Sequence, residues 1–353
     1  MSENSFFRSP FFAMCRKIAG MLVKIAIAGA IVWYMFLRDP EKIIKSISSF
    51  SYLYLIPALG FYLSHMIYCS FRWRRLADIL GVKLSAFEAI SLTFQGYFFS
   101  LVIPGGAIGG DVVKMGAISK RSQKGEKAEG AFTVLMDRII GMIALFSLCL
   151  VIIPPAFALL LNVSIPDADL SLTAKKLLIA GLILLCLAGL AASMVIFFHK
   201  KLRQVALIDK LFVFGNKITH DMVDRLTSAA DVYAAQWKAT GILALESVFL
   251  VHLMTVVPLF FILSGMGVEY SFFALTVAMT VGNIAGLLPI FPAGVGGRDV
   301  VNVMIMIASG IAEENAQAAM LIYTAILLIS NLLGGLFFVF DPGHKLVSGR
   351  DQE

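Results

Sequence analysis

Long uninterrupted blocks of apolar residues are the feature that most constrains how this chain can fold. About twenty such residues, with a rise of ~1.5 Å each in a helix, match the ~30 Å hydrocarbon core of a bilayer. Because 59% of the 353 residues are hydrophobic and only 15% are charged, a soluble globular domain is excluded. We therefore predict an all-α polytopic membrane protein with about six spanning helices. The predicted spans are residues 18–37, 52–71, 131–153, 177–198, 241–263 and 318–340.

Two further apolar stretches, 86–103 and 271–290, differ from the spans because each ends in a cluster of proline and glycine. A short, weaker helix is expected after each cluster, at 109–119 and at 298–310. A helix, a breaker and a half-helix form the pattern of a re-entrant hairpin or a discontinuous helix. The sequence therefore predicts two re-entrant helical hairpins, at 86–119 and 271–310.

The distribution of basic residues predicts the orientation of the chain in the membrane. Lysine and arginine are concentrated in three loops, which the positive-inside rule places in the cytoplasm, at 72–83, 114–127 and 199–217. Loops 38–50 and 154–176 are expected outside, and both termini are expected in the cytoplasm. The same rule explains the net charge of +6, so nucleic acid is not an expected partner.

Each half of the chain reads span, span, hairpin, span, and three spans per half force the halves into opposite orientations. The pattern predicts an inverted-topology repeat. The first repeat is 1–153 and the second is 177–341. An external loop, 154–176, connects them, and a cytoplasmic tail, 342–353, follows the second. The second repeat contains a cytoplasmic linker, 199–238. Within the linker, 219–238 has helical spacing, so it either packs against the protein or lies along the interface.

Both breakers carry the pattern Pro-x-Gly-x-x-Gly-x-Asp, at 104–111 and at 292–299, and the two copies align without a gap. Proline removes a backbone donor and ends a helix, whereas glycine permits a positive φ or a close approach of backbones. The half-helix that follows points free N–H groups and its positive dipole end toward the bilayer middle. Such a site suits an anion, for example a lipid phosphate. The alternative is a tight turn whose glycines allow close helix packing.

Ionisable residues at membrane depth are energetically costly and are therefore candidates for a functional site. Asp111 and Asp299 are expected where the half-helices start, either as N-caps or as charges that bind a cationic headgroup, a proton or a basic partner. Asp137 and Arg138 lie inside the third span. There Arg138 is expected to pair with Asp137, with Asp111 or with a lipid phosphate, or the two residues form a structural ion pair.

Lys114 and Arg298 are further candidate phosphate ligands, with an interfacial position as the alternative for Lys114. Glu246 and His252 are expected to form helix–helix hydrogen bonds. No nucleophile–base pair or metal-ligand spacing is recognisable, so no catalytic residue, metal or cofactor is predicted. The predicted substrate-binding set is Pro104, Gly105, Gly106, Gly109, Gly110, Asp111, Lys114, Asp137, Arg138, Pro292, Gly294, Gly297, Arg298 and Asp299.

At these residues the sequence resembles the flippase-like family that includes the membrane region of lysylphosphatidylglycerol synthases, the multiple peptide resistance factors. The resemblance covers roughly residues 15–340 and is carried by 104–111, by the pair at 137–138 and by 292–299. It implies a prokaryotic inner-membrane protein that moves lipids between leaflets or serves envelope lipid metabolism. Three departures concern the substrate. Asp299 replaces an expected glutamate, Tyr323 stands where the family often has a basic residue, and the asparagine often found ahead of the first motif is missing, with Gly96-Tyr97 nearby. The sequence lacks the soluble aminoacyl-transferring domain, so lipid lysinylation is not expected.

The leading hypothesis is a flippase or translocase that moves a phospholipid or a polyprenyl-phosphate lipid across a prokaryotic cytoplasmic membrane. Arg138 and the half-helix N-termini would hold the phosphate, and rocking of the two halves would give alternating access. The alternatives are an ion-coupled carrier of a small solute and an intramembrane enzyme or accessory subunit of envelope lipid metabolism. Besides lipid, the expected partners are a second copy of the chain or envelope lipid-synthesis enzymes.

Overall fold

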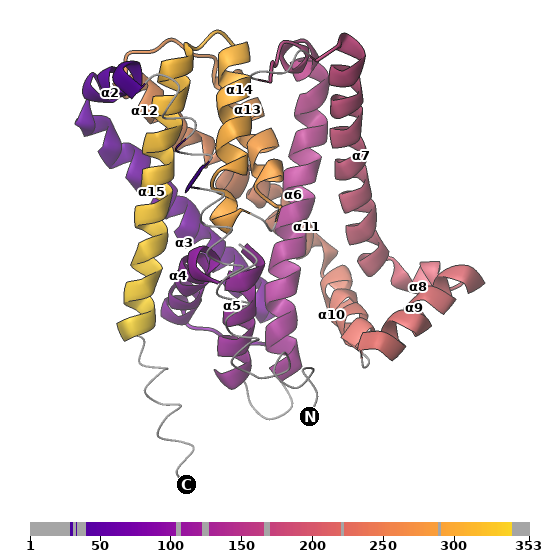
Figure 1. Cartoon of the computed structure of the whole chain (residues 1–353). Coiled ribbons are helices and arrows are strands. Elements are labelled where there is room, and N and C mark those ends of the chain that lie inside the picture. Colours follow the sequence, from indigo (N-terminus) through magenta and orange to yellow (C-terminus); the bar gives the residue numbers. More distant parts are fainter. Residues whose placement is uncertain are drawn as a thin grey trace, which may run out of the picture. The chain divides into compact units, whose positions relative to one another are not determined.

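The predicted all-α fold is confirmed by the structure, a computed structural model in which helices dominate (Figure 1). The first predicted span, 18–37, lies outside the described residues except for 29–30 and 33. The structure describes residues 29–30, 33, 40–103, 107–121, 127–165, 170–219, 222–288 and 291–340.

Within these residues, five helical stretches are long and apolar enough to cross a membrane, and they coincide with the other five predicted spans. The stretches are Tyr52–Ile79, Glu129–Leu161, Leu172–Phe197, Trp237–Gly265 and Glu313–Phe340. The helices that form them are η2 (Tyr52–Tyr54) with α3 (Leu55–Ile79), α6 (Lys127–Leu161), α7 (Leu172–Phe197), α11 (Trp237–Ser247) with the π-helix η3 (Val248–Leu253) and α12 (Val256–Gly265), and α15 (Glu313–Phe340).

Each predicted hairpin contains two helices in the structure. The first consists of α4 (Ala86–Val102) and α5 (Ala107–Arg121), and the second of α13 (Phe272–Ala285), the short turn η4 (Pro292–Gly294) and α14 (Gly297–Ala308). With 14 residues, α13 is shorter than the roughly 20 that a spanning helix needs. Every residue from Ala274 to Thr280 is buried, so protein surrounds this middle part of α13 on all sides, whereas Phe272 and Phe273 at its start are exposed. The depth of the two hairpins in the bilayer stays a prediction.

Several predicted loops are wrong, because helices continue beyond the apolar blocks. The loops predicted at 72–83 and 114–127 begin with the last turns of α3 and α5, and α6 passes through Pro154 and Pro155 to Leu161. An apolar block of sequence needs to be only as long as the hydrocarbon core is thick. The helix itself can continue beyond that block with one polar face, since its backbone hydrogen bonds are internal. The remaining predicted loops contain α2 (Pro40–Ser48), α8 (His199–Leu202), α9 (Ala206–Thr219) and α10 (Met222–Ala235).

The helices form two compact units whose segments alternate along the chain. Among the described residues, the first unit consists of those up to Tyr62, of Phe94–Val113 and of Val256–Phe340. The second consists of Leu63–Thr93 and Lys114–Thr255. This division by contact differs from the predicted sequence repeats, 1–153 and 177–341. The inverted repeat stays a prediction.

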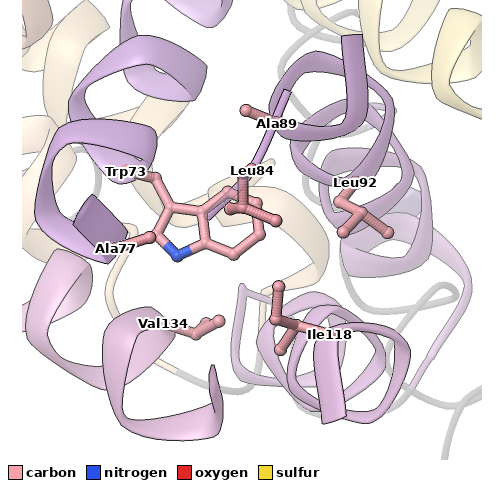
Figure 2. Close-up of a cluster of buried hydrophobic side chains, with 7 residues drawn as sticks. All are labelled: Trp73, Ala77, Leu84, Ala89, Leu92, Ile118 and Val134. Atoms are coloured by element: carbon pink, nitrogen blue, oxygen red, sulfur yellow. The ribbon is translucent and has the colours of Figure 1, made fainter. Parts of the chain in front are cut away.

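Trp73 lies at the centre of one core of the second unit. Its indole is fully buried and donates a 3.0 Å hydrogen bond from Nε1 to Oγ1 of Thr133. The residues of this core come from α3, α4, α5, α6 and the turn after α3. The core therefore fixes the C-terminal half of α5 against α3, α4 and α6. Figure 2 shows the cluster, which comprises Trp73, Ala77, Leu84, Ala89, Leu92, Ile118 and Val134.

A second core of this unit decides how the linker segment 219–238 lies. Tyr233 of α10 is fully buried among residues of α3, α6 and α11, and its hydroxyl donates a 2.9 Å hydrogen bond to the carbonyl of Leu76. Burial raises the pKa of the Tyr233 hydroxyl, so this group stays a donor at neutral pH. Of the two predicted alternatives, packing against the protein is therefore confirmed for α10.

In the first unit, α13 and α14 lie side by side, and α15 packs against α2, α12 and α14 (Figure 1). Two ring pairs join the end of α4 to α15, because Phe94 lies 5.2 Å from Phe337 and Phe99 lies 5.0 Å from Phe338 between centroids. These ring pairs fix the second half of α4 against the end of α15.

Candidate functional site

Arg298 is the centre of a buried polar group at the start of α14. Only 4% of this residue is exposed, and its Nε and Nη2 donate to Oδ1 of Asp299 at 2.9 and 2.5 Å. Nη2 also donates to Oγ1 of Thr324 at 3.0 Å, and the guanidinium carbon lies 5.0 Å from the ring centre of Tyr323. Tyr62 packs edge-on against Tyr323 at 6.0 Å. We call Arg298, Asp299, Tyr323 and Thr324 the Arg298 group.

The second glycine motif makes the turn that positions Arg298. Gly294 and Gly296 have φ of 78° and 95°, values that favour glycine, and Ala293 also has a positive φ of 49°. Gly294 lies directly against Gly286, so α13 and the turn approach closely. Pro292 begins η4, and a Cβ on Gly297 would collide with the ring of Phe291. The motif is therefore both a tight turn and the frame of a buried charged group.

Asp299 caps α14 from inside the helix. Asp299 was expected at the start of the half-helix, as a possible N-cap. In the structure Gly296 is the N-cap, and Asp299 is the third helical residue. Its Oδ2 accepts a 3.0 Å hydrogen bond from the N–H of Gly296, while Oδ1 holds Arg298. The Asp299 carboxylate therefore serves both as a cap of α14 and as the partner of the Arg298 charge.

The first motif is described from residue 107 onward; Pro104, Gly105 and Gly106 lie outside the described residues. Gly109 and Gly110 are buried in the first turn of α5. A Cβ on Gly110 would collide with the carbonyl oxygen of Gly96 in α4, so close helix packing requires glycine there. Asp111 is half-buried and is the fifth residue of α5, one turn beyond an N-cap position.

Arg72 is the centre of a second buried polar group, in the second unit. Its Nε donates to Oδ1 of Asp137 at 2.9 Å, its Nη2 to the Asp137 carbonyl at 3.3 Å, and its Nη1 to Oγ of Ser247 at 3.0 Å. Lys114 places its Nζ 3.9 Å from Oδ2 of Asp137 and 3.7 Å from the ring centre of Trp73. We call Arg72, Trp73, Lys114, Asp137 and Ser247 the Arg72 group.

The Arg72 group corrects one prediction. Arg72 was expected in a cytoplasmic loop, but it lies in α3 and is 6% exposed. Lys114 is equally buried within the protein, and its depth in the membrane stays a prediction. Asp137 binds Arg72 and Lys114, and Arg138 is half-buried in α6 beside them in sequence. The signal for Arg72 is the apolar spacing that continues past it at Trp73, Leu76 and Ala77, which indicates that α3 goes on as a packed helix.

The predicted helix–helix hydrogen bonds of Glu246 and His252 are confirmed. Oε2 of Glu246 accepts hydrogen bonds from Tyr68 at 2.7 Å and from Arg75 at 2.6 Å. The imidazole Nε2 of His252 lies 3.0 Å from the carbonyl oxygen of Gly141. Since His252 belongs to η3, the π-helix that follows Ser247, the helix changes its winding directly next to the Arg72 group.

The two groups share a chemistry that suits phosphate. In each, an arginine is fixed by a carboxylate and by a hydroxyl, and an aromatic ring lies against a cation of the group. A guanidinium fork fits a phosphate as well as a carboxylate, because both offer two oxygens to parallel N–H groups. Burial in an apolar surrounding strengthens such an interaction relative to water.

Comparison with known proteins agrees with this membrane architecture. Residues 21–335 match the family described as the Lysylphosphatidylglycerol synthase TM region. The chain is similar to a UPF0104 membrane protein of Pyrococcus horikoshii, with 20% identity over 327 residues that cover 91% of this chain and 96% of the relative. It is also similar to a UPF0104 membrane protein of Archaeoglobus fulgidus, with 30% identity over 121 residues, 34% of this chain and 35% of the relative. Because this family match spans residues 21–335, well over half of the sequence, the chain belongs to the family of the lysylphosphatidylglycerol synthase transmembrane region and is a membrane protein.

Proposed function

We propose that this protein moves a phosphate-bearing lipid between the leaflets of a prokaryotic cytoplasmic membrane. The observation that carries the proposal is the Arg298 group, a buried arginine held by a carboxylate at the turn between two helices of a membrane protein. A charged pair in this environment costs free energy that an apolar pair would not, which favours a role in binding over a role in stability.

The carboxylate of Asp299 occupies the position that a lipid phosphate would take on Arg298. When a phosphate replaces it, Arg298 keeps an anionic partner, and Asp299 keeps the N–H of Gly296 as a donor on its other oxygen. Neither charge is then left without a hydrogen bond, so the exchange avoids the cost of a bare buried ion. Thr324 and Tyr323 hold the guanidinium in place during the exchange.

In the second unit, the Arg72 group offers the same exchange with two cations around one carboxylate. Lys114 contributes a point charge without directional preference, whereas Arg72 contributes the fork that orients a phosphate. The aromatic ring under Lys114 keeps the ammonium in its buried position. We therefore assign phosphate binding to Arg298 and to Arg72 with Lys114, and we assign release to Asp299 and Asp137.

Vesicle reconstitution with fluorescent phospholipids tests the proposal, with dithionite bleaching as the measure of which leaflet holds each lipid. We expect the wild type to expose inner-leaflet lipid that protein-free vesicles protect. Arg298→Gln should slow the exchange at least about tenfold, because one hydrogen-bonded charge contact contributes ~1.5–3 kcal/mol. Asp111→Asn tests the first motif in the same assay.

The matched control is Arg225→Gln, the same change at an exposed position of α10. It should leave the exchange rate unchanged. Uptake of inorganic phosphate into the same vesicles separates a lipid translocase from a carrier of small anions. Wild-type rates equal to those of protein-free vesicles for every phospholipid tested, or equal rates for Arg298→Gln and wild type, would overturn the proposal.

A further inference from the structure

The segment between the end of α7 and the start of α11 lies at one face of the membrane. Both of these helices belong to candidate spans, which end at Phe197 and resume at Trp237. Trp237 is 67% exposed, and an exposed tryptophan at the end of a span is typical of the boundary between hydrocarbon and headgroups. The helices α8, α9 and α10 connect these two span ends (Figure 1).

One side of α9 is tied to its neighbours in the second unit. The ring of Phe212 lies 4.8 Å from the guanidinium carbon of Arg203, and Asn216 Oδ1 accepts a 3.0 Å hydrogen bond from the N–H of Asp224. Asp209 on the same side lies 3.7 Å from Arg203. These contacts fix the rotation of α9 about its axis, and so they determine which side chains face outward.

The opposite side of α9, which we call the outer face, combines bulky apolar residues with lysines. Val213, Phe214 and Ile218 are 59%, 63% and 60% exposed. Lys210 and Lys217 are exposed as well. These five residues have the spacing i, i+3, i+4, i+7 and i+8, which places them on one side of a helix. A helix that only faced water would not present this apolar surface.

Two acidic side chains of α10 bind cations that precede α9. Asp224 accepts a 2.7 Å hydrogen bond from Arg203, and Asp231 lies 2.9 Å from Nζ of Lys200. The five residues of the outer face include two lysines and no acidic residue. The outer face is consequently both apolar and basic, the combination found in helices that lie in anionic membrane surfaces.

We propose that the outer face of α9 binds the anionic lipid surface of the surrounding membrane, with Phe214 and Ile218 inserted between acyl chains. Lys210 and Lys217 contact lipid phosphates at the rim. A lipid surface fits better than a protein groove because α9 extends from span ends that already lie at the interface, and because lysine is depleted in the buried centres of protein interfaces. This surface is distinct from the two buried groups and does not depend on the proposed transport.

Depth-dependent quenching tests this proposal on the full chain. Phe214→Cys, combined with Cys15→Ser, is labelled with an environment-sensitive fluorophore; the cysteines Cys69, Cys149 and Cys186 are buried. The protein is reconstituted in phosphatidylcholine vesicles, and in vesicles with about 30% phosphatidylglycerol, each containing brominated lipid. We expect quenching in the anionic vesicles to fall at least about twofold in the double variant Lys210→Gln/Lys217→Gln, since each lysine contributes attraction to an anionic surface.

High salt should reduce the quenching in the same way, because it screens exposed charges. Lys176→Gln removes one charge at the opposite end of α7 and should leave the quenching of the label unchanged. Equal quenching in neutral and anionic vesicles, or no effect of the two lysine changes, would contradict recognition of anionic lipid. A label that no brominated lipid quenches would show that the outer face meets water or another protein, and it would overturn the proposal.

Discussion

At the scale of single residues, some members of the two buried polar groups are recognisable from the sequence and others are not. Asp137 and Arg298 are recognisable because a charge inside an apolar block is costly and conspicuous. Arg72 is not, because it stands at the edge of its block, next to Arg74 and Arg75, and looks like a loop residue. Only the three-dimensional packing of α3 on α6 reveals which of these arginines faces Asp137.

The Arg72–Asp137 pair makes a quantitative prediction about stability. Arg72→Met and Asp137→Leu should each lower the free energy of unfolding by about 3–5 kcal/mol, because each removes one partner of a buried ion pair. The double variant should lose at least about 1 kcal/mol less than the sum of the two. Unfolding in detergent, followed by circular dichroism, measures the coupling.

The exposed pair Lys83–Asp78, at 3.2 Å, provides the comparison. Lys83→Met and Asp78→Leu should show little coupling, since solvent screens an exposed ion pair. Strict additivity for Arg72 and Asp137 would mean that the two charges do not stabilise each other in the folded protein.

At the scale of elements, the apolar blocks locate the helices but not their ends. The proline pair of α6 indicates a break, yet the helix continues for six residues after Pro155, up to Leu161. Prolines are tolerated in membrane helices, where neighbouring helices and local adjustments satisfy the freed carbonyls. The glycine motifs were recognisable as breakers, but their partners, such as Gly96 for Gly110, depend on how α4 and α5 meet.

This contact makes Gly110→Ala a sharp test of how closely α4 and α5 pack. The added methyl group would meet the carbonyl oxygen of Gly96, so the helices must separate, and we expect a loss of about 1–3 kcal/mol in stability. Gly116→Ala lies in the same helix with no atom near the added methyl group, and it should stabilise the protein slightly. Similar melting temperatures for the two variants in detergent would refute the tight packing of α4 on α5.

At the scale of the whole molecule, composition and block length were sufficient to predict an all-α membrane protein, and the structure and the family agree. The division into two compact units was not predicted. Three of its boundaries fall inside α3, α4 and α5, where no change in composition marks them. A repeat in sequence follows the order of elements, whereas a unit follows contacts, and the two need not coincide.

Cysteine labelling from each side of the membrane tests the predicted orientation. The inverted repeat requires a cysteine at Lys124 to react from the cytoplasmic side and one at Glu313 to react from the outside. The predicted side of each position follows from the basic loops, which the positive-inside rule places in the cytoplasm, and from the three spans in each half. Labelling of both positions by the same impermeant reagent on one side would refute the inverted topology and leave the helical fold unaffected.

The hydrogen bond from Tyr233 to the Leu76 carbonyl connects the surface helix α10 to α3. Leu76 follows Arg72 by one helical turn, and α10 packs directly on α9. The outer face of α9 and the Arg72–Asp137 pair are therefore linked by direct contacts within the second unit, through α10 and the hydrogen bond from Tyr233 to α3.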